Sequence, residues 1–202
     1  TPFAHDALDL DRYRDHLRWL VESGIDGLCP CGTTGEFLYL TVQEKIQLYE
    51  ASAEVSGEAD LVPCVWDNHP GQCAELSRAA ADLGADAVFL PPPLYHRVSE
   101  DVILRWYERV VEATDLPVLA YHHPRTHNPI DLPLLNRLRR ALGIIGMKDS
   151  SGEVARVKEL ADAHPDAIWV GGESQLGRGP ALGPARGFIS RQVNLWPSLA
   201  RQ

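Results

Sequence analysis

Short apolar runs recur along the chain, separated by stretches in which apolar residues have helical spacing. Each run is continuous rather than alternating, which is typical of parallel strands buried on both faces. The seven runs are Ile25–Leu28, Leu61–Val65, Ala87–Leu90, Val118–Tyr121, Ile144–Met147, Ile168–Val170 and Phe188–Ile189. Strands that alternate with helices predict an α/β fold with a parallel sheet.

The stretches between these runs predict helices. Thr41 and Glu44 have the spacing of a capping box at the start of one helix. Another includes Leu76 and stops at Gly84, since glycine commonly follows the last helical residue. The remaining predicted helices lie over 13–21, 99–110, 132–142 and 153–163.

Two architectures fit this alternation, a doubly wound sheet and a (β/α)8 (TIM) barrel. The first strand-to-helix turn, Cys31–Gly35, lacks the G-x-G-x-x-G pattern of dinucleotide-binding sheets. We favour a single barrel-shaped catalytic domain over 1–202, because reactive residues follow the strand ends. A barrel usually has about 250 residues. The prediction is therefore a barrel incomplete at both ends, without its first strand and its C-terminal helices.

Charge and cysteine content limit the possible partners and the location of the protein. The formal net charge of −9 argues against nucleic acid or an anionic membrane surface as a partner. No apolar run approaches the roughly 18 residues that cross a bilayer. Four cysteines without a recognisable signal peptide indicate a reducing, cytoplasmic location. They are Cys29, Cys31, Cys64 and Cys73, and because their C-x-C spacing is unlike that of zinc sites, we interpret them as buried thiols.

The most informative residue is Lys148, which directly follows the apolar run Ile144–Met147. Lysine is scarce, with three lysines against sixteen arginines. An unpaired ammonium at the end of a core strand is costly to desolvate. Two interpretations stay open. Lys148 forms an ion pair, for example with Asp149, or its pKa is depressed so that the amine attacks a carbonyl and forms a Schiff base.

Other polar residues follow neighbouring strands. Tyr121 ends the preceding strand, so its phenol can exchange protons with a substrate beside Lys148, or its ring simply packs. The turn Gly32-Thr33-Thr34-Gly35 offers hydroxyls and amides to a carboxylate, although it also suits an ordinary turn. Three prolines precede Tyr95 and direct it outward.

Histidines raise a different possibility. His122, His123 and His127 lie close in sequence and suggest a zinc-dependent aldolase. Pro124 and Pro129 prevent a helix there, so His123 and His127 do not form an i, i+4 ligand pair. The zinc enzyme is retained as an alternative to a metal-free one.

Several motifs occur together in one order. They are Thr1–Phe3, Gly32–Glu36, Gly84–Ala87, Pro92–Tyr95, Pro117–Tyr121, Gly146–Ser150 and Gly187–Ser190, followed by Asn194 and Pro197. In this set the chain resembles the dihydrodipicolinate synthase / N-acetylneuraminate lyase family of class I aldolases. The resemblance covers nearly the whole chain. It implies a (β/α)8 barrel and a lyase that needs no cofactor and no metal.

The resemblance also implies roles for residues. Lys148 would form an imine with pyruvate or another 2-oxo acid. Thr33 and Thr34, with Gly32, would hold the substrate carboxylate. Tyr121 would relay protons, assisted by Thr34.

Two further residues have roles only through the resemblance. Tyr95 would assist the proton relay and reach the site of a neighbouring subunit, which implies a homo-oligomer, a dimer or tetramer. The carbonyl of Ile189 would lie near the lysine. The remaining partners are small molecules, a 2-oxo acid and an aldehyde.

Arg125 marks a departure from the family pattern. Members commonly read Tyr-Asn-x-Pro-x-Arg-Thr-Gly, and in the synthase that arginine helps to bind a carboxylate of the substrates, which makes Arg125 the candidate substrate-binding arginine. Here Arg125 comes one residue early and His127 replaces the glycine. A shift of one residue in an extended segment turns a side chain to the opposite face. The histidines would then meet the second substrate and favour a polyhydroxy aldehyde. Condensation like that of dihydrodipicolinate synthase and cleavage of 2-keto-3-deoxy sugar acids both remain open, as does a barrel that only binds 2-oxo acids.

Overall fold

Seven short parallel strands form the centre of the computed structural model, which describes residues 1–171 and 181–198. They are β3 (Gly27–Leu28), β4 (Asp60–Leu61), β5 (Val88–Leu90), β6 (Val118–His122), β7 (Gly146–Asp149), β8 (Ile168–Gly171) and β9 (Gly187–Ile189). Each overlaps one of the seven apolar runs, so their prediction as strands is confirmed.

The strands pair in chain order. β5 to β9 form one sheet in the order β5-β6-β7-β8-β9, and β3 pairs with β4. A single parallel bridge between Cys64 and Phe89 links the two sets. A doubly wound sheet would instead reverse its strand order at a switch point. The uninterrupted order therefore supports the barrel. Within the described residues, no pairing joins β9 to β3.

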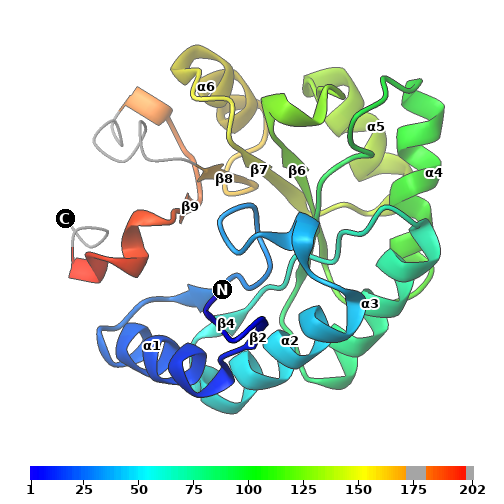
Figure 1. Ribbon diagram of the computed structural model, residues 1–202. Helices are drawn as coiled ribbons and strands as arrows, with labels where there is room; N and C mark the ends of the chain where they lie inside the picture. Colours follow the sequence, from blue (N-terminus) through cyan, green and yellow to red (C-terminus); the bar gives the residue numbers. More distant parts are fainter. Residues whose placement is uncertain (172–180, 199–202) are drawn as a thin grey trace.

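In the described parts of the chain six helices surround the strands, and Figure 1 shows them following one another around the outside. They are α1 (Leu10–Glu22), α2 (Val42–Ser56), α3 (Pro70–Asp82), α4 (Glu100–Val111), α5 (Leu132–Leu142) and α6 (Val154–Ala163). All six correspond to predicted helices. The capping box of Thr41 and Glu44 is present at the start of α2. Gly84 follows α3 with φ 74°, a left-handed conformation that suits glycine.

A small hairpin near the N-terminus was not predicted. It pairs β1 (Phe3–Ala4) with β2 (Ala7–Leu8) in antiparallel fashion. His5 and Asp6 form its turn with φ 51° and 63°. Turns with two positive φ values usually contain Asn-Gly or Asp-Gly. A His-Asp pair between strands of two residues gives no such signal.

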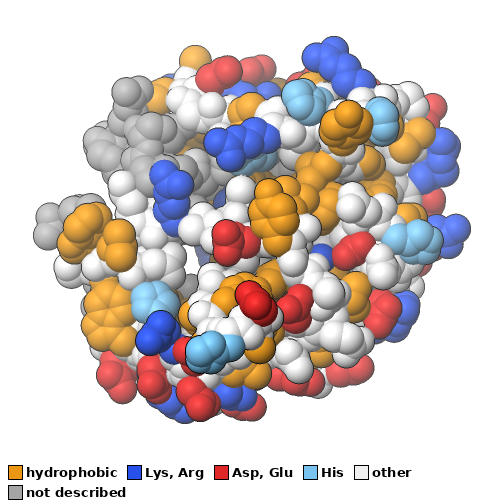
Figure 2. Space-filling model, viewed as in Figure 1, with side chains coloured by type: hydrophobic (Ala, Val, Ile, Leu, Met, Phe, Trp, Pro, Cys, Tyr) orange, Lys and Arg blue, Asp and Glu red, His pale blue; other side chains and the backbone are white. Residues whose placement is uncertain are grey.

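The apolar faces of the strands and helices meet in one core. Phe89 on β5, Tyr49 on α2, Tyr107 on α4 and Leu135 on α5 are fully buried. Short 3-10 helices lie in the connections, among them η1 (Phe37–Tyr39), η2 (Pro124–Thr126) and η4 (Gln192–Asn194). None of the helices in the described part is long and apolar enough to cross a membrane. In Figure 2 acidic side chains gather along the lower edge, in keeping with the net charge of −9.

Candidate functional site

Lys148 lies inside β7, where its side chain is almost completely buried. Its exposed fraction is 8%. The Nζ atom is 4.5 Å from the ring centroid of Tyr121 and 4.9 Å from that of Phe89. Gly171 on the next strand leaves room for it, since a Cβ there would lie 3.1 Å from Lys148 Cε. Two aromatic rings and a glycine therefore enclose the amine.

Asp149 does not pair with this lysine. Its fully buried carboxylate accepts from Arg156 Nε at 2.8 Å and from the Ser151 backbone amide at 2.9 Å. Side chains alternate across a strand, so Asp149 and Lys148 point to opposite faces. The interpretation of Lys148 as the ion-pair partner of Asp149 is wrong for this reason.

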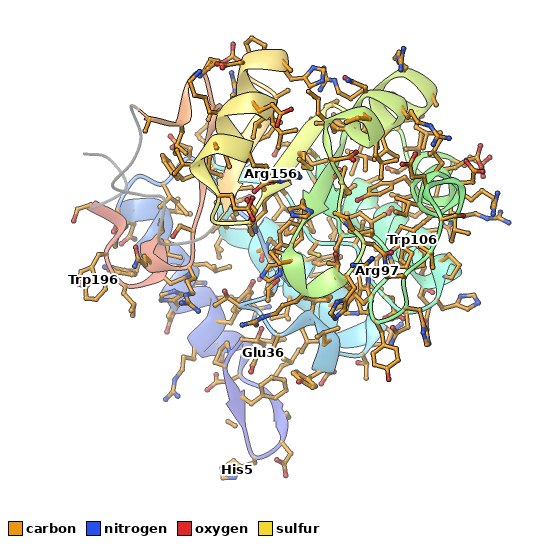
Figure 3. The ribbon with its side chains drawn as sticks, turned by 90° about the horizontal axis from the view of Figure 1, so that it is seen from above. His5, Glu36, Arg97, Trp106, Arg156 and Trp196 are labelled. Atoms are coloured by element: carbon orange, nitrogen blue, oxygen red, sulfur yellow. The ribbon has the colours of Figure 1, made fainter. Side chains whose placement is uncertain are left out.

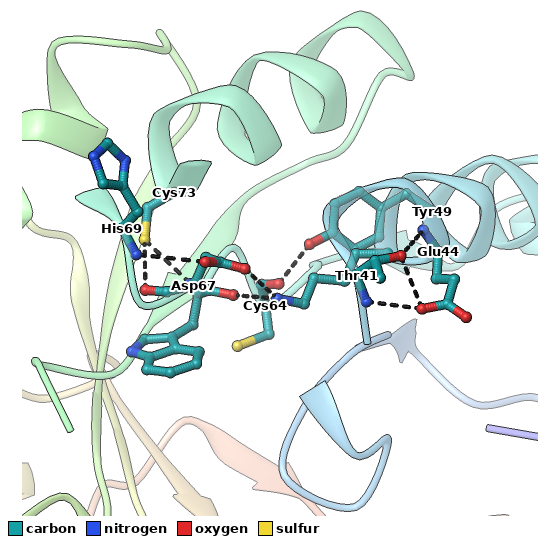
Figure 4. A network of polar contacts seen from close by, with 9 residues as sticks. Thr41, Glu44, Tyr49, Cys64, Asp67, His69 and Cys73 are labelled. Atoms are coloured by element: carbon teal, nitrogen blue, oxygen red, sulfur yellow. Dashed lines mark hydrogen bonds and ion pairs between the residues drawn. The ribbon is translucent and has the colours of Figure 1, made fainter. Parts of the chain in front are cut away.

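The other two lysines have carboxylate partners. Lys45 is 1% exposed, and its Nζ lies 2.9 Å from Asp67 Oδ2 and 2.9 Å from the Trp66 carbonyl oxygen (Figure 4). Lys158 pairs with Asp162 on the surface of α6. Across the described residues, Lys148 Nζ has no oxygen acceptor within hydrogen-bond distance. It is therefore the lysine whose amine is available for chemistry.

Tyr121 lies directly opposite Lys148 in the register of β6 and β7. Its hydroxyl is 3.1 Å from the Thr33 hydroxyl, although the two belong to segments 88 residues apart. Its ring also packs edge-on against Phe89 with centroids 5.7 Å apart. Phe89 is thus a shared support for Lys148 and Tyr121. No pattern in the sequence distinguishes it from the other apolar residues of its strand.

The turn after β3 brings Thr33 to Tyr121. The Glu36 amide donates to the Thr33 carbonyl at 3.1 Å, which closes the turn. Gly35 packs closely there, because a Cβ would lie 3.2 Å from Cys31 Cα. Thr33 and Thr34 are exposed at the surface of the turn. Gly32 sits over the ring of Phe89, where a Cβ would be 3.5 Å from Cζ. The hydroxyl that meets Tyr121 belongs to Thr33, not to Thr34.

Three more predicted residues make fewer described contacts. Tyr95 is 81% exposed with φ 75°, and its ring contacts that of His96. Ile189 ends β9 and pairs in register with Gly171. Arg125 is exposed on η2. None of the three forms a described side-chain hydrogen bond with Lys148 or Tyr121.

The described residues contain no set of zinc ligands for the alternative of a zinc-dependent aldolase. Among the described residues, no three His, Cys, Asp or Glu side chains are grouped so as to hold a metal ion. The four cysteines are free, and three of them are buried. Burial raises the pKa of the Cys29 thiol to about 11 and that of Cys64 to about 12. These thiols are therefore protonated and inert at neutral pH.

A polar pocket of about 320 Å³ opens at the carboxyl ends of β6 and β7. Its lining residues are Arg97, His122, His123, Pro124, His127, Pro129, Ser151, Glu153 and Arg156. Sequence reasoning had singled out the three histidines but missed Arg97, Glu153 and Arg156. Figure 3 shows Arg97 arriving from the segment before α4 and Arg156 from α6. Nothing in the sequence indicates that these two segments converge.

Burial governs the two inner histidines of this pocket. It lowers the pKa of His122 to about 4, against a smaller opposing effect of Asp149. Burial also lowers the pKa of His123, and the positive charges of Arg125 and Lys148 lower it further. Both rings are therefore neutral at pH 7.

Comparison with known proteins agrees with this geometry. The model of the dihydrodipicolinate synthetase family matches residues 1–202. A 4-hydroxy-tetrahydrodipicolinate synthase of Corynebacterium diphtheriae is 37% identical over 205 residues, covering 100% of this chain and 68% of that protein. An uncharacterised DapA-like lyase of Halobacterium salinarum is 35% identical, covering 97% of this chain and 65% of the relative. This chain thus spans about two thirds of the length of these relatives.

Solved structures show the same fold. The 4-hydroxy-tetrahydrodipicolinate synthase from Methylacidiphilum fumariolicum SolV has a TM-score of 0.92 at 29% identity, covering 99% of this chain and 68% of that one. The N-acetylneuraminate lyase from Mycoplasma synoviae has a TM-score of 0.91 at 26% identity, covering 100% and 69%. The predicted barrel architecture is confirmed. With a family model that matches from end to end, the chain belongs to the dihydrodipicolinate synthetase family.

Proposed function

We propose that this protein is a class I lyase that forms a Schiff base between Lys148 and a 2-oxo acid such as pyruvate. The observation that supports this proposal most directly is the environment of the Lys148 side chain. Its amine is nearly buried with aromatic neighbours, and the described residues offer it no carboxylate. No carboxylate holds the Nζ atom, so it is free to approach a carbonyl carbon. Neutral amines are the nucleophiles that attack carbonyls.

The covalent steps balance without a cofactor. Lys148 Nζ attacks C2 of the 2-oxo acid, and the carbinolamine loses one water to give the imine. Loss of a proton from C3 gives an enamine, whose C3 attacks the carbonyl carbon of an aldehyde. The new alkoxide takes up a proton, and water hydrolyses the imine to free Lys148 and the product. The reverse sequence cleaves a C–C bond.

Tyr121 and Thr33 supply the proton path in this scheme. Their hydroxyls are 3.1 Å apart, and Tyr121 lies opposite Lys148 in the register. A phenol in that position can donate to the carbinolamine oxygen and later to the alkoxide. The backbone amides of Gly32, Thr33 and Thr34 and the hydroxyls of the two exposed threonines suit the substrate carboxylate. We assign Thr34 to carboxylate binding rather than to the relay.

The proposal extends to the aldehyde substrate and to a homo-oligomeric assembly. Relatives named as 4-hydroxy-tetrahydrodipicolinate synthase support a condensing enzyme, and the sialic acid lyase fold supports cleavage of sugar acids as the second candidate. Tyr95, exposed at its loop, is suited to reach a neighbouring subunit of a homo-oligomer. The free thiols fit a cytoplasmic location.

Exchange of the pyruvate methyl protons tests the chemistry without knowledge of the aldehyde. The protein is incubated with pyruvate in D₂O, and proton NMR follows the methyl signal. Enamine formation at Lys148 predicts its loss, and Lys148→Arg should abolish the exchange because guanidinium stays protonated. Lys158→Arg is the matched control and should exchange normally. A protein that binds pyruvate without exchange would be a binding barrel rather than a lyase.

A further inference from the structure

Asn128 is a buried amide whose shortest contacts all go to one neighbouring loop. Its exposed fraction is 2%. Its Nδ2 atom donates to the carbonyl oxygens of Pro93 at 2.7 Å and His96 at 2.8 Å, and its Oδ1 atom accepts from the Val98 amide at 3.0 Å. Both donors and the oxygen of the side chain are therefore engaged with backbone groups. The connection after β6 is thereby joined to the connection after β5, 30 or more residues earlier in the chain.

The loop that Asn128 contacts contains a strained turn with Tyr95 at its centre. Tyr95 has φ 75°, and the His96 amide donates to the Leu94 carbonyl across it at 3.0 Å. A hydrogen bond over one residue with that φ is typical of the rare, strained form of the γ-turn. Residues other than glycine keep such a conformation only where surrounding contacts fix it. Pro93 precedes the turn and His96 ends it, so the two Nδ2 contacts of Asn128 fix it at both ends.

Other side chains contact only the beginning of this loop. Trp106 on α4 donates from Nε1 to the Pro91 carbonyl at 3.1 Å. Tyr95 is 81% exposed and forms no side-chain hydrogen bond among the described residues. In that same part of the chain, Asn128 is the one side chain that hydrogen-bonds the backbone of Pro93–Val98. The conformation of the turn therefore depends on its amide.

We propose that Asn128 is a positioning residue, which fixes the turn that carries Tyr95 and so presents the Tyr95 phenol to the site of a neighbouring subunit. This inference rests on the proposed function, in which Tyr95 serves a homo-oligomer of the lyase. Asn128 itself contacts no substrate. A catalytic group that is misplaced by about 1 Å can lose about 100-fold in rate, so release of the turn should slow the reaction without changing the reacting residues.

Limited proteolysis tests whether Asn128 fixes the turn. Asn128→Ala removes all three contacts, and Asn128→Asp keeps the oxygen acceptor but loses both donors. In both variants trypsin should cleave after the exposed Arg97 about tenfold faster than in wild type, because the loop opens without unfolding of the domain. Cleavage after Arg18, in the middle of α1, reports global unfolding and should stay unchanged. Asn136→Ala is the matched control, since it removes a side-chain hydrogen bond between α5 and the end of α6. Equal acceleration after Arg97 and Arg18, or none after Arg97, would overturn the proposal.

Exchange of the pyruvate methyl protons measures the consequence for catalysis. Tyr95→Phe and both Asn128 variants should slow the exchange by about 10- to 100-fold and leave KM for pyruvate within about threefold, because Lys148 and the carboxylate turn are untouched. Asn136→Ala should exchange like wild type. Normal exchange in Tyr95→Phe or in the Asn128 variants, or a change in KM alone, would contradict a positioning role.

Hybrid oligomers separate a role toward the neighbouring subunit from a general structural effect. Two variants with different affinity tags are co-expressed and purified through both tags. An Asn128→Ala subunit keeps its own Lys148 and receives a correctly presented Tyr95 from a Lys148→Arg subunit, so this hybrid should regain exchange. The hybrid of Asn128→Ala with Tyr95→Phe should not, because neither subunit presents a phenol in the right place. Recovery in the second hybrid instead of the first, or the absence of any hybrid, would refute the assignment to a neighbouring subunit.

Failure of the lyase function is recognised separately. A wild-type protein that exchanges no pyruvate protons refutes the proposed function, and cleavage after Arg97 then still decides whether Asn128 fixes the turn. Exchange in wild type, with Asn128 variants that match it in both exchange and cleavage, refutes the role of Asn128 and leaves the lyase function standing.

Discussion

Removing the Tyr121 hydroxyl tests the proton path at the smallest structural cost. In Tyr121→Phe the ring keeps its edge-on contact with Phe89 at 5.7 Å and its place 4.5 Å from Lys148 Nζ. The variant loses one hydrogen bond, the 3.1 Å contact with Thr33. One such bond contributes about 0.5–1.5 kcal/mol to the free energy of unfolding. Turnover should fall much further, by about 10²–10⁴, the range of general acid–base catalysis.

The assay pairs kinetics with unfolding. Steady-state kcat and KM for pyruvate are measured in Tyr121→Phe, Thr33→Val and the double variant, and urea unfolding gives the stability of each. If the two hydroxyls act as a unit, the double variant should be no slower than Tyr121→Phe by more than about threefold. Activity of Tyr121→Phe within about threefold of wild type, with only the stability changed, would refute the relay and leave Tyr121 a packing residue.

Three further changes probe the surroundings. Arg156→Met leaves the buried Asp149 carboxylate without its cation and should lower the free energy of unfolding by about 3–5 kcal/mol in urea titrations. Phe89→Leu removes the ring beneath Lys148 and should reduce kcat more than it raises KM in steady-state assays. For His122, whose pKa is about 4 when folded and about 6.5 when unfolded, stability should fall by about 2 kcal/mol as pH drops from 6.5 to 4.

Each of these has its own control. Arg105→Met, at an exposed site of α4, should change stability by less than about 0.5 kcal/mol. An equal effect of both methionine variants would contradict the role given to the buried pair.

The pH dependence is tested by removing His122. The unfolded state takes up the His122 proton first as the pH falls, so His122→Gln should reduce the dependence of the free energy of unfolding on pH between 6.5 and 4. Unchanged slopes there would rule out His122 as the titrating group. For Phe89→Leu, a loss confined to KM would contradict a positioning role.

Much of the fold follows from the pattern of the chain. Continuous apolar runs marked all seven strands, because strands buried on both faces need apolar residues at every position. The hairpin at His5 and Asp6 escaped, since strands of two residues have no period to detect. The lysine also stood out in the sequence, because charged residues are rare at the end of a core strand. The sequence could not show the ion-pair partner of Asp149, which is Arg156 on α6.

The site was predictable only where neighbouring strands carry it. Tyr121 and Lys148 end neighbouring strands, so their proximity follows from strand order alone. The contact of Tyr121 with Thr33 rather than Thr34 depends on how the turn at Gly35 closes, which spacing does not specify. Arg97 lies on an exposed loop with no motif around it. Its place in the pocket arises only from tertiary packing of distant segments.

Reductive trapping of the imine tests the central claim most directly. The protein is treated with pyruvate and borohydride, digested, and each of its three lysines is examined by mass spectrometry. One reduced pyruvate on Lys148, absent from Lys148→Arg and retained in Lys158→Arg, is the result expected from an amine that lacks a carboxylate partner. Labelling of Lys45 or Lys158 instead, or no adduct in a folded protein, would contradict the account.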